Sequence, residues 1–178
     1  METGLTQEKM NRVAILLCIS VLFAVICGLL ALVILPQSQA KGKKQRIICR
    51  DNLYQIQFAY RIWSGHNNDN YPWQLSVTSG GTMELCDLDA TGFDKNGAVH
   101  FQVASNELNT PKILVCPADS EHLAAENFAG LKAGNVSYQI RTGKDIDDAH
   151  PREILALCPI HEIIVYCDGT VVKAITKQ

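Results

Sequence analysis

The sequence lacks several features that would assign it to a common functional class. Its formal net charge is only -2 over 178 residues, which argues against bulk electrostatic binding to nucleic acid. It has no internal repeat and no low-complexity tract, which excludes a repeat architecture. It also has no Cys-x-x-Cys pair, the spacing found in most structural zinc sites.

Charged residues are absent from one long stretch, residues 13–35. A helix of this length spans about 34 Å, enough to cross a hydrocarbon core of about 30 Å. We therefore expect a transmembrane helix in the lipid bilayer, preceded by a short polar tail over residues 1–12. The apolar run is longer than the h-region of a signal peptide, about 7–15 residues, although Ser38-Gln39-Ala40 leaves cleavage open as an alternative.

An amphipathic helix is predicted directly after the apolar run, over residues 36–65. Pro36 is expected to kink or briefly interrupt the helix because it removes one backbone hydrogen bond. Apolar residues then recur at helical spacing and predict one packing face, and Gly65 is a plausible end. The residues of this face are Cys49, Leu53, Ile56, Tyr60 and Trp63. The basic residues that begin this segment can contact anionic lipid headgroups or simply form a solvated face.

The remaining residues, 66–178, are predicted to form a small globular domain with an antiparallel sheet. Asn96-Gly97 and Asp168-Gly169 are hairpin signals. Helical turns are expected within residues 119–129. The expected strands are residues 75–78, 83–88, 98–103, 112–116, 135–140, 162–166 and 170–175. The fold class expected from this order is α+β, with a long N-terminal helix packed on the sheet.

Five of the seven cysteines lie outside the apolar run. In an oxidising compartment they allow two disulfides and one unpaired thiol. Two of them open Cys-Pro steps, and we favour Cys116–Cys158 as one bridge, with free thiols and a metal site as alternatives. Cys158 and His161 could also form a nucleophile and base, but nothing marks an oxyanion hole or a third orienting group. We therefore predict that the protein is not an enzyme.

One acidic segment has the opening of a calcium-binding loop. Asp87, Asp89 and Thr91 have the spacing of the first three ligands, and Asp94 adds an oxygen donor, but position twelve is Ala98 instead of the bidentate Glu. Such residues also favour turns because their side chains bond locally to the backbone. We predict no cofactor, with calcium as the weaker alternative.

Several short motifs occur in the order found in the type IV pilin and type II secretion pseudopilin superfamily, which this chain resembles. They comprise the end of the apolar helix, an Asn-Leu-x-Gln-Ile segment, an Asn/Asp loop closing on Tyr-Pro, a Cys-Pro-x-Asp step and a terminal Asp-Gly hairpin. The matching residues are Ile34-Leu35-Pro36, Ala40-Lys41, Cys49, Asn52-Leu53-Tyr54-Gln55-Ile56, Asn67-Asn68-Asp69-Asn70-Tyr71-Pro72, Cys116-Pro117-Ala118-Asp119 and Tyr166-Cys167-Asp168-Gly169-Thr170-Val171.

The resemblance implies a pilin-like fold and a pseudopilin-like, single-pass structural or assembly subunit of a type II secretion or type IV pilus-like system. Its partners would be other pilin-like subunits or secretion-system membrane proteins. It also implies a bacterial inner-membrane location with the C-terminal domain in the periplasm and residues 1–12 as a cytoplasmic tail, whereas the basic flank after the span alone would place the C-terminal domain in the cytoplasm. The family's peptidase would cut between Gly4 and Leu5, but Glu8 stands one position earlier than the family's assembly glutamate. The alternative is a stand-alone, membrane-tethered extracytoplasmic binding domain that does not assemble.

Overall fold

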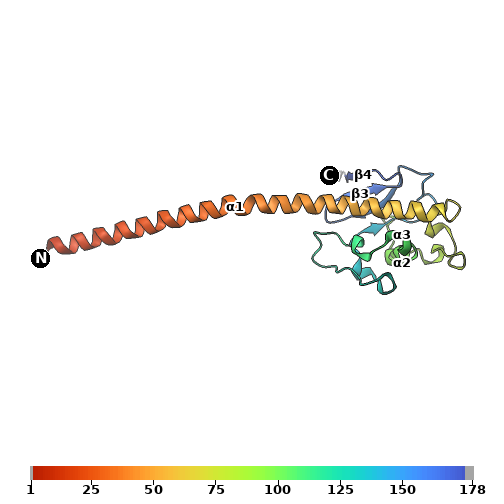
Figure 1. Ribbon diagram of the computed structural model, residues 1–178, viewed down its shortest axis with the longest axis horizontal. Coiled ribbons are helices and arrows are strands. Elements are labelled where there is room, and N and C mark those ends of the chain that lie inside the picture. Colours follow the sequence, from red (N-terminus) through yellow and green to blue (C-terminus); the bar gives the residue numbers. More distant parts are fainter. Residues whose placement is uncertain (1, 175–178) are drawn as a thin grey trace. The chain divides into compact units, whose positions relative to one another are not determined.

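The computed structural model, drawn in Figure 1, describes residues 2–174. The chain divides into two units, one ending at Lys43 and the other beginning at Lys44. Within the first helix, α1 (Glu2–Gly65), the side chains of residues 2–11, 13, 14, 18, 30–36 and 38 lie outside the description. Because α1 contributes to both units, its two parts are described separately.

In the first unit, α1 is helical from Glu2 onward. The predicted polar tail is therefore helical, and the helical backbone continues through Pro36, where an interruption was expected. The described apolar side chains between residues 15 and 29 are exposed, for example Phe23 at 68%. Among the residues whose side chains are described, no helix has a stretch long and apolar enough to cross a membrane.

The second unit, which begins at Lys44 and which we call the head domain, is built around the C-terminal part of α1. The predicted packing face is buried: Cys49, Leu53, Ile56 and Tyr60 are fully inaccessible, and Trp63 is 7% exposed. Burying a large apolar side chain contributes about 1.5–3 kcal/mol. This face therefore supplies much of the hydrophobic contact that holds α1 in the head domain.

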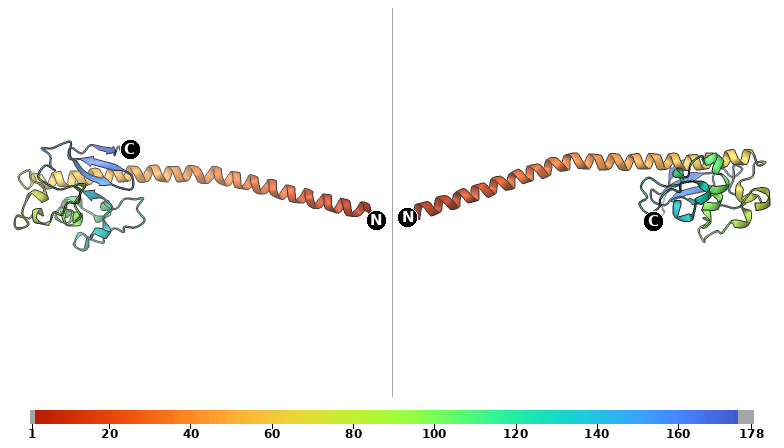
Figure 2. Two further views of the ribbon diagram at one scale, coloured as in Figure 1. Left: turned by 180° about the vertical axis from the view of Figure 1, so that it is seen from behind. Right: turned by 60° about the horizontal axis from the view of Figure 1, so that its bottom comes forward.

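A four-stranded antiparallel sheet packs with this part of α1, as the views in Figure 2 show. The strands run in chain order and comprise β1 (Gln139–Ile140), β2 (Ile154–Cys158), β3 (Ile163–Tyr166) and β4 (Val171–Lys173). The predicted hairpin at Asp168-Gly169 is confirmed, and Gly169 has the positive φ of 84° that its turn requires. The structure thus confirms an α+β fold with a long helix packed on a small antiparallel sheet.

Several predicted strands are wrong, because the structure has helices there. Residues 98–103 belong to α2 (Gly97–Val103), followed by α3 (Ser105–Leu108). Phe101, Ala104 and Leu108 are all buried at 3% exposure or less, a helical spacing that a strand would not give. Residues 112–116 overlap a 3₁₀ helix that starts as helices do, because Thr110 accepts a hydrogen bond from the backbone of Lys112 and Pro111 occupies the first turn.

Six short 3₁₀ helices, including the one just described, lie between residues 72 and 135 where strands and loops were expected. They are η1 (Pro72–Gln74), η2 (Val77–Ser79), η3 (Met83–Leu85), η4 (Pro111–Leu114), η5 (Phe128–Gly130) and η6 (Ala133–Asn135). Of the helical turns expected within residues 119–129, only the beginning of η5 lies in that range. The strand expected at 135–140 is shortened to β1, and residue 175 of the last predicted strand lies outside the described residues.

The central strand β2 was not predicted. Its sequence, Ile-Leu-Ala-Leu-Cys, contains only one β-branched residue and three good helix formers. Tertiary context decides its conformation, because β2 pairs with β1 on one side and with β3 on the other. Leu155, Ala156 and Cys158 are fully buried as a result.

Candidate functional site: a thiol-imidazole cluster

Four potential metal-binding side chains converge in the head domain. They are Cys49 of α1, Cys116 after η4, Cys158 at the end of β2 and His161 in the turn before β3. Each offers one ligand atom, and these atoms lie within 4.8 Å of one another. The three cysteines are at most 1% exposed, whereas His161 is half-buried at the surface side. We call this set the thiol-imidazole cluster.

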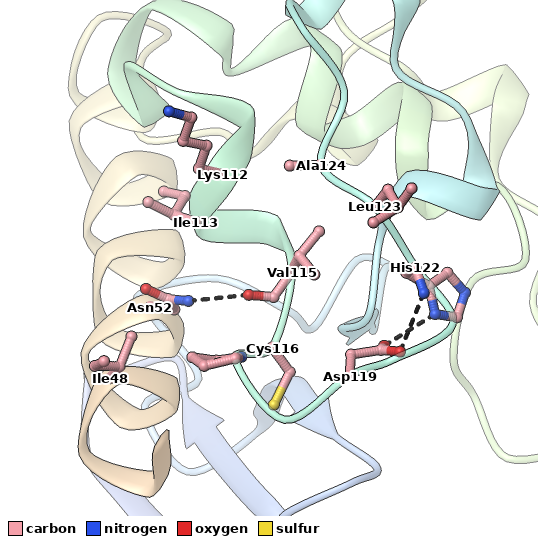
Figure 3. Close-up of a pocket in the computed structure, with 11 residues that line it drawn as sticks. Ile48, Asn52, Lys112, Ile113, Val115, Cys116, Asp119, His122, Leu123 and Ala124 are labelled. Carbon is pink, nitrogen blue, oxygen red and sulfur yellow. Dashed lines mark hydrogen bonds and ion pairs between the residues drawn. The ribbon is translucent and has the colours of Figure 1, made fainter. Parts of the chain in front are cut away.

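Cys49 is held in register by two polar residues of α1, one turn to either side of it. Gln45 donates a hydrogen bond from Nε2 to the carbonyl oxygen of Pro117 over 2.8 Å. Asn52 donates from Nδ2 to the carbonyl oxygen of Val115 over 3.4 Å, as Figure 3 shows. Because the two carbonyls flank Cys116, these bonds fix the position of α1 along its axis relative to that residue.

Cys116 is positioned by a hydrogen-bonded chain that ends on a carboxylate. Its backbone N–H donates to Ser137 Oγ over 2.9 Å, and Ser137 Oγ donates to Asp119 Oδ2 over 2.7 Å. The other oxygen of Asp119 accepts from the backbone N–H groups of Glu121 and His122. Burial raises the pKa of Asp119, but these hydrogen bonds outweigh it and lower the pKa to about 2. Asp119 is therefore ionised at neutral pH and anchors the Cys-Pro turn.

Cys158 is the acceptor at the centre of the three thiols. The thiol of Cys49 hydrogen-bonds to it, and burial opposes its ionisation, but the backbone N–H groups of His161 and Ile160 also donate to its sulfur. Together these contacts lower the pKa of Cys158. Cys158 and burial in turn raise the pKa of Cys49. Cys158 is thus the sulfur on which the surrounding donors converge.

The two Cys-Pro turns have the same local design. The backbone N–H of Ala118 hydrogen-bonds to the sulfur of Cys116, as that of Ile160 does to Cys158, two residues after the cysteine in each case. Burial nevertheless raises the pKa of Cys116 to about 11. His161, three residues after Cys158, reaches across so that its Nδ1 lies 3.3 Å from the sulfur of Cys116. Each turn thus presents one sulfur together with backbone donors.

The predicted disulfide partners, Cys116 and Cys158, are brought together, but the bridge itself is not formed. All cysteines whose side chains are described are free thiols: Cys27, Cys49, Cys86, Cys116, Cys158 and Cys167. Cys49 approaches the same two sulfurs, so the structure has a cluster of three thiols in place of a pair. Sequence spacing could not reveal this third partner.

The candidate calcium ligands do not converge on one point. Asp87 pairs with Lys95 over 3.0 Å. Asp89 caps its own turn by accepting from the backbone N–H and the hydroxyl of Thr91 over 2.7 and 2.6 Å. Asp94 points into the interior. Of the four, only Asp94 belongs to a potential metal-binding group among the described residues.

That second group combines the half-buried Cys86 with the buried Asp94 and His100. Asp94 accepts a hydrogen bond from Thr142 Oγ1 over 2.7 Å, and its other neighbour is His100 Nε2 at 3.1 Å. The side chains of Asp94 and His100 are fully buried. The Nδ1 of His100 contacts Thr82 Oγ1 at 2.8 Å. Burial lowers the pKa of His100 against the opposing effect of Asp94. The group therefore anchors α2 to the loops around it.

A pocket opens beside the cluster, between α1 and the segment that carries η4 and the first Cys-Pro turn (Figure 3). Ile48 and Asn52 line one wall, and Lys112 and Leu123 lie on the other side. His122, at its rim, bonds through Nδ1 to Asp119 at 2.9 Å. The imidazole that lies close to the buried thiols is that of His161, not that of His122. Cys158 and His161, which were considered as a nucleophile and its base, thus belong to a set of four side chains.

The predicted processing residues Gly4 and Leu5 lie in the helical backbone of α1, with side chains outside the described residues. The sequence pointed to Cys116 and Cys158 but not to their grouping with Cys49. The signal that it carries is the parallel between Cys116-Pro117-Ala118-Asp119 and Cys158-Pro159-Ile160-His161, each with a polar residue three positions after the cysteine, and this parallel concerns the two turns alone. No protein-family model, curated protein or solved structure matches the chain.

Proposed function

We propose that this chain is a pseudopilin-like structural subunit, anchored in the bacterial inner membrane by a single helix with its head domain in the periplasm. It would serve a type II secretion or type IV pilus-like system. The mechanism is lateral packing: apolar N-terminal helices associate side by side, and the head domains are arranged around them.

The observation that supports this proposal most is that the apolar side chains of α1 are buried in one part of the helix and exposed in the other. From Cys49 to Trp63 the helix buries one face in the head domain. Between residues 15 and 29 the described apolar side chains are exposed, and the sequence places no charge between residues 13 and 35. A helix that is apolar all round requires an apolar environment, because exposing it to water costs about 25 cal/mol per Å².

The test begins with the mature N-terminus. The chain is expressed with a prepilin peptidase, purified from membranes and analysed by intact mass spectrometry. Processing at the predicted bond gives a protein that begins at Leu5, and Gly4→Val is the matched control that should keep its full length. Recovery of the wild-type chain in the soluble fraction after cell lysis would refute the membrane anchor.

Assembly is tested separately by chemical crosslinking in intact membranes. A ladder of crosslinked pilin-like subunits is the expected result. Monomers alone, in a protein that still fractionates with membranes, would favour the alternative of a tethered binding domain that does not assemble.

A further inference from the structure

We propose that Cys49, Cys116, Cys158 and His161 bind one zinc ion in a closed, tetrahedral structural site. The inference uses only residues of the head domain and does not depend on the proposed membrane function. It adds a metal to a chain for which the sequence alone favoured none.

The geometry of the cluster fits this ion. A tetrahedral site with Zn–S bonds of about 2.3 Å needs sulfur atoms roughly 3.8 Å apart. The four ligand atoms of the thiol-imidazole cluster lie within 4.8 Å of one another, so small adjustments of side-chain rotamers bring all four onto one ion. The Nδ1 of His161 already lies 3.3 Å from the sulfur of Cys116.

The donor types select zinc over the other common metals. Three sulfurs and one imidazole nitrogen form a Cys₃His set, which is a recurrent structural zinc combination. Calcium and magnesium require oxygen ligands, and the cluster offers none. With four protein ligands no coordination position is left for water or substrate, which distinguishes a structural zinc from a catalytic one.

The surroundings of the sulfurs suit a bound anionic complex. Three thiolates and one Zn²⁺ carry a net charge of about -1, which must be stabilised inside the protein. The backbone N–H groups of Ala118, Ile160 and His161 already donate to two of the sulfurs. Outer-shell donors of this kind orient metal ligands and support their charge.

The two alternative interpretations of the cysteines, a disulfide and free thiols, explain less of the observed arrangement. One disulfide would join two of the three sulfurs and leave a buried thiol beside an unused imidazole. Free thiols can act as small apolar side chains, but that role does not explain why His161 turns toward them. A zinc ion uses all four groups at once.

Binding would join three segments that are distant in the chain. Cys49 belongs to α1, Cys116 to the turn after η4, and Cys158 and His161 to the connection between β2 and β3. Zinc would therefore stabilise the docking of α1 in the head domain, because a metal that binds only the folded state adds its binding free energy to stability.

The experiment uses the full chain, purified in detergent under reducing conditions and freed of metal with a chelator. Zn²⁺ alone is then titrated in, with metal content measured by mass spectrometry and stability by thermal unfolding. One equivalent of zinc and a higher Tm are expected. Co²⁺ in place of zinc should give the absorption of a tetrahedral, thiolate-bound ion. Absence of both effects would overturn the proposal.

Three variants locate the site. Cys158→Ser and His161→Gln should each weaken zinc binding by more than about tenfold, because loss of a direct ligand exceeds the 10–100-fold cost typical of losing an outer-shell partner. His161 is half-buried, so its variant is expected to fold even if Cys158→Ser is not. Cys167→Ser is the matched control, since Cys167 is equally buried but lies outside the cluster.

Two results would contradict the assignment directly. One is zinc binding of wild-type strength in His161→Gln. The other is a disulfide between any two of Cys49, Cys116 and Cys158, found by non-reducing peptide mapping of protein alkylated during extraction from its membrane.

Discussion

Removing the hydroxyl of Tyr60 should stabilise the protein, which is the opposite of what most changes in a buried core do. Tyr60 is fully buried, and its phenolic oxygen has no hydrogen-bond partner among the described residues. The ring itself is well packed, with centroids 5.0 Å from Trp73 and 6.1 Å from Phe101. Tyr60→Phe keeps these contacts and deletes only the unsatisfied group.

The size of the effect follows from two opposing contributions. Burying an unpaired hydroxyl costs about 1–3 kcal/mol. The small void left by the oxygen forfeits several van der Waals contacts worth about 0.1–0.2 kcal/mol each. The net expectation for Tyr60→Phe is a gain of about 1 kcal/mol, which corresponds to a rise in Tm of roughly 2–6 °C for a domain of this size.

Tyr138 provides the matched control, because the same change there should have the opposite sign. It is 3% exposed, and its hydroxyl accepts a hydrogen bond from Asn52 Nδ2 over 3.1 Å and is also hydrogen-bonded to the thiol of Cys49. Tyr138→Phe leaves that buried amide without this partner and should cost about 1–2 kcal/mol. The two tyrosines are therefore expected to differ by about 2–3 kcal/mol under an identical chemical change.

The assay is urea unfolding of the full chain in detergent, at one fixed zinc concentration for all variants. The fluorescence of Trp63 and Trp73 reports the transition, since both indoles are buried in the head domain. An unchanged m-value with a shifted midpoint shows that stability itself has changed. Loss of about 1 kcal/mol or more in Tyr60→Phe would show that the hydroxyl is paired and that the reasoning is wrong.

Two further changes have defined expectations. Burial raises the pKa of Asp94, but hydrogen bonds from Thr142 and neighbouring backbone groups outweigh it, so the net pKa is lowered. Its stabilisation is complete above about pH 4 and is lost as the pH falls further. Asp94→Asn should therefore cost about 1.5–3 kcal/mol at pH 7, because it weakens charge-assisted hydrogen bonds to the carboxylate, and much less in strong acid, measured by urea unfolding with chelator present; a cost independent of pH would contradict this. Gly169→Ala should cost about 1–2 kcal/mol in the same assay, because φ is +84° and a Cβ would lie 3.1 Å from Gln57 Oε1. Gly134→Ala, with open space around the new Cβ, should be nearly neutral, and equal costs for both would rule out the conformational explanation.

Local patterns predicted the parts of the fold that depend on neighbours in the sequence. The packing face of α1 follows from apolar residues at helical spacing between Cys49 and Trp63, all of which are buried. The β3–β4 hairpin follows from Asp168-Gly169, where glycine readily adopts the left-handed conformation. Each signal relates residues fewer than about five positions apart, so it can be recognised without knowledge of the fold.

Patterns that depend on tertiary contacts were misleading. Residues 98–103 are an apolar run that suits a strand or a buried helix equally, and the helix is favoured because His100 and Phe101 both enter the core. The strand β2 has the opposite problem, because its leucine and alanine residues prefer helices and only its two neighbouring strands make it extended. In both cases the decisive partners are distant in the sequence.

The thiol-imidazole cluster could be predicted only in part for the same reason. The Cys-Pro steps marked Cys116 and Cys158 as special, and His161 follows the second at close range. The sequence indicated only that Cys49 is an apolar position on a helix face. Its role depends on the register of α1 against the turn after η4, which the bonds from Gln45 and Asn52 determine.

The place of α1 at the start of the chain has a consequence for synthesis. The apolar face from Cys49 to Trp63 leaves the ribosome before every residue that covers it, and the last strand, Val171–Lys173, is made more than a hundred residues later. At about 5–20 residues per second the uncovered face is exposed for several seconds or longer. During that interval the nascent chain is at its most prone to aggregation, and early engagement of α1 by a membrane or a chaperone would protect it.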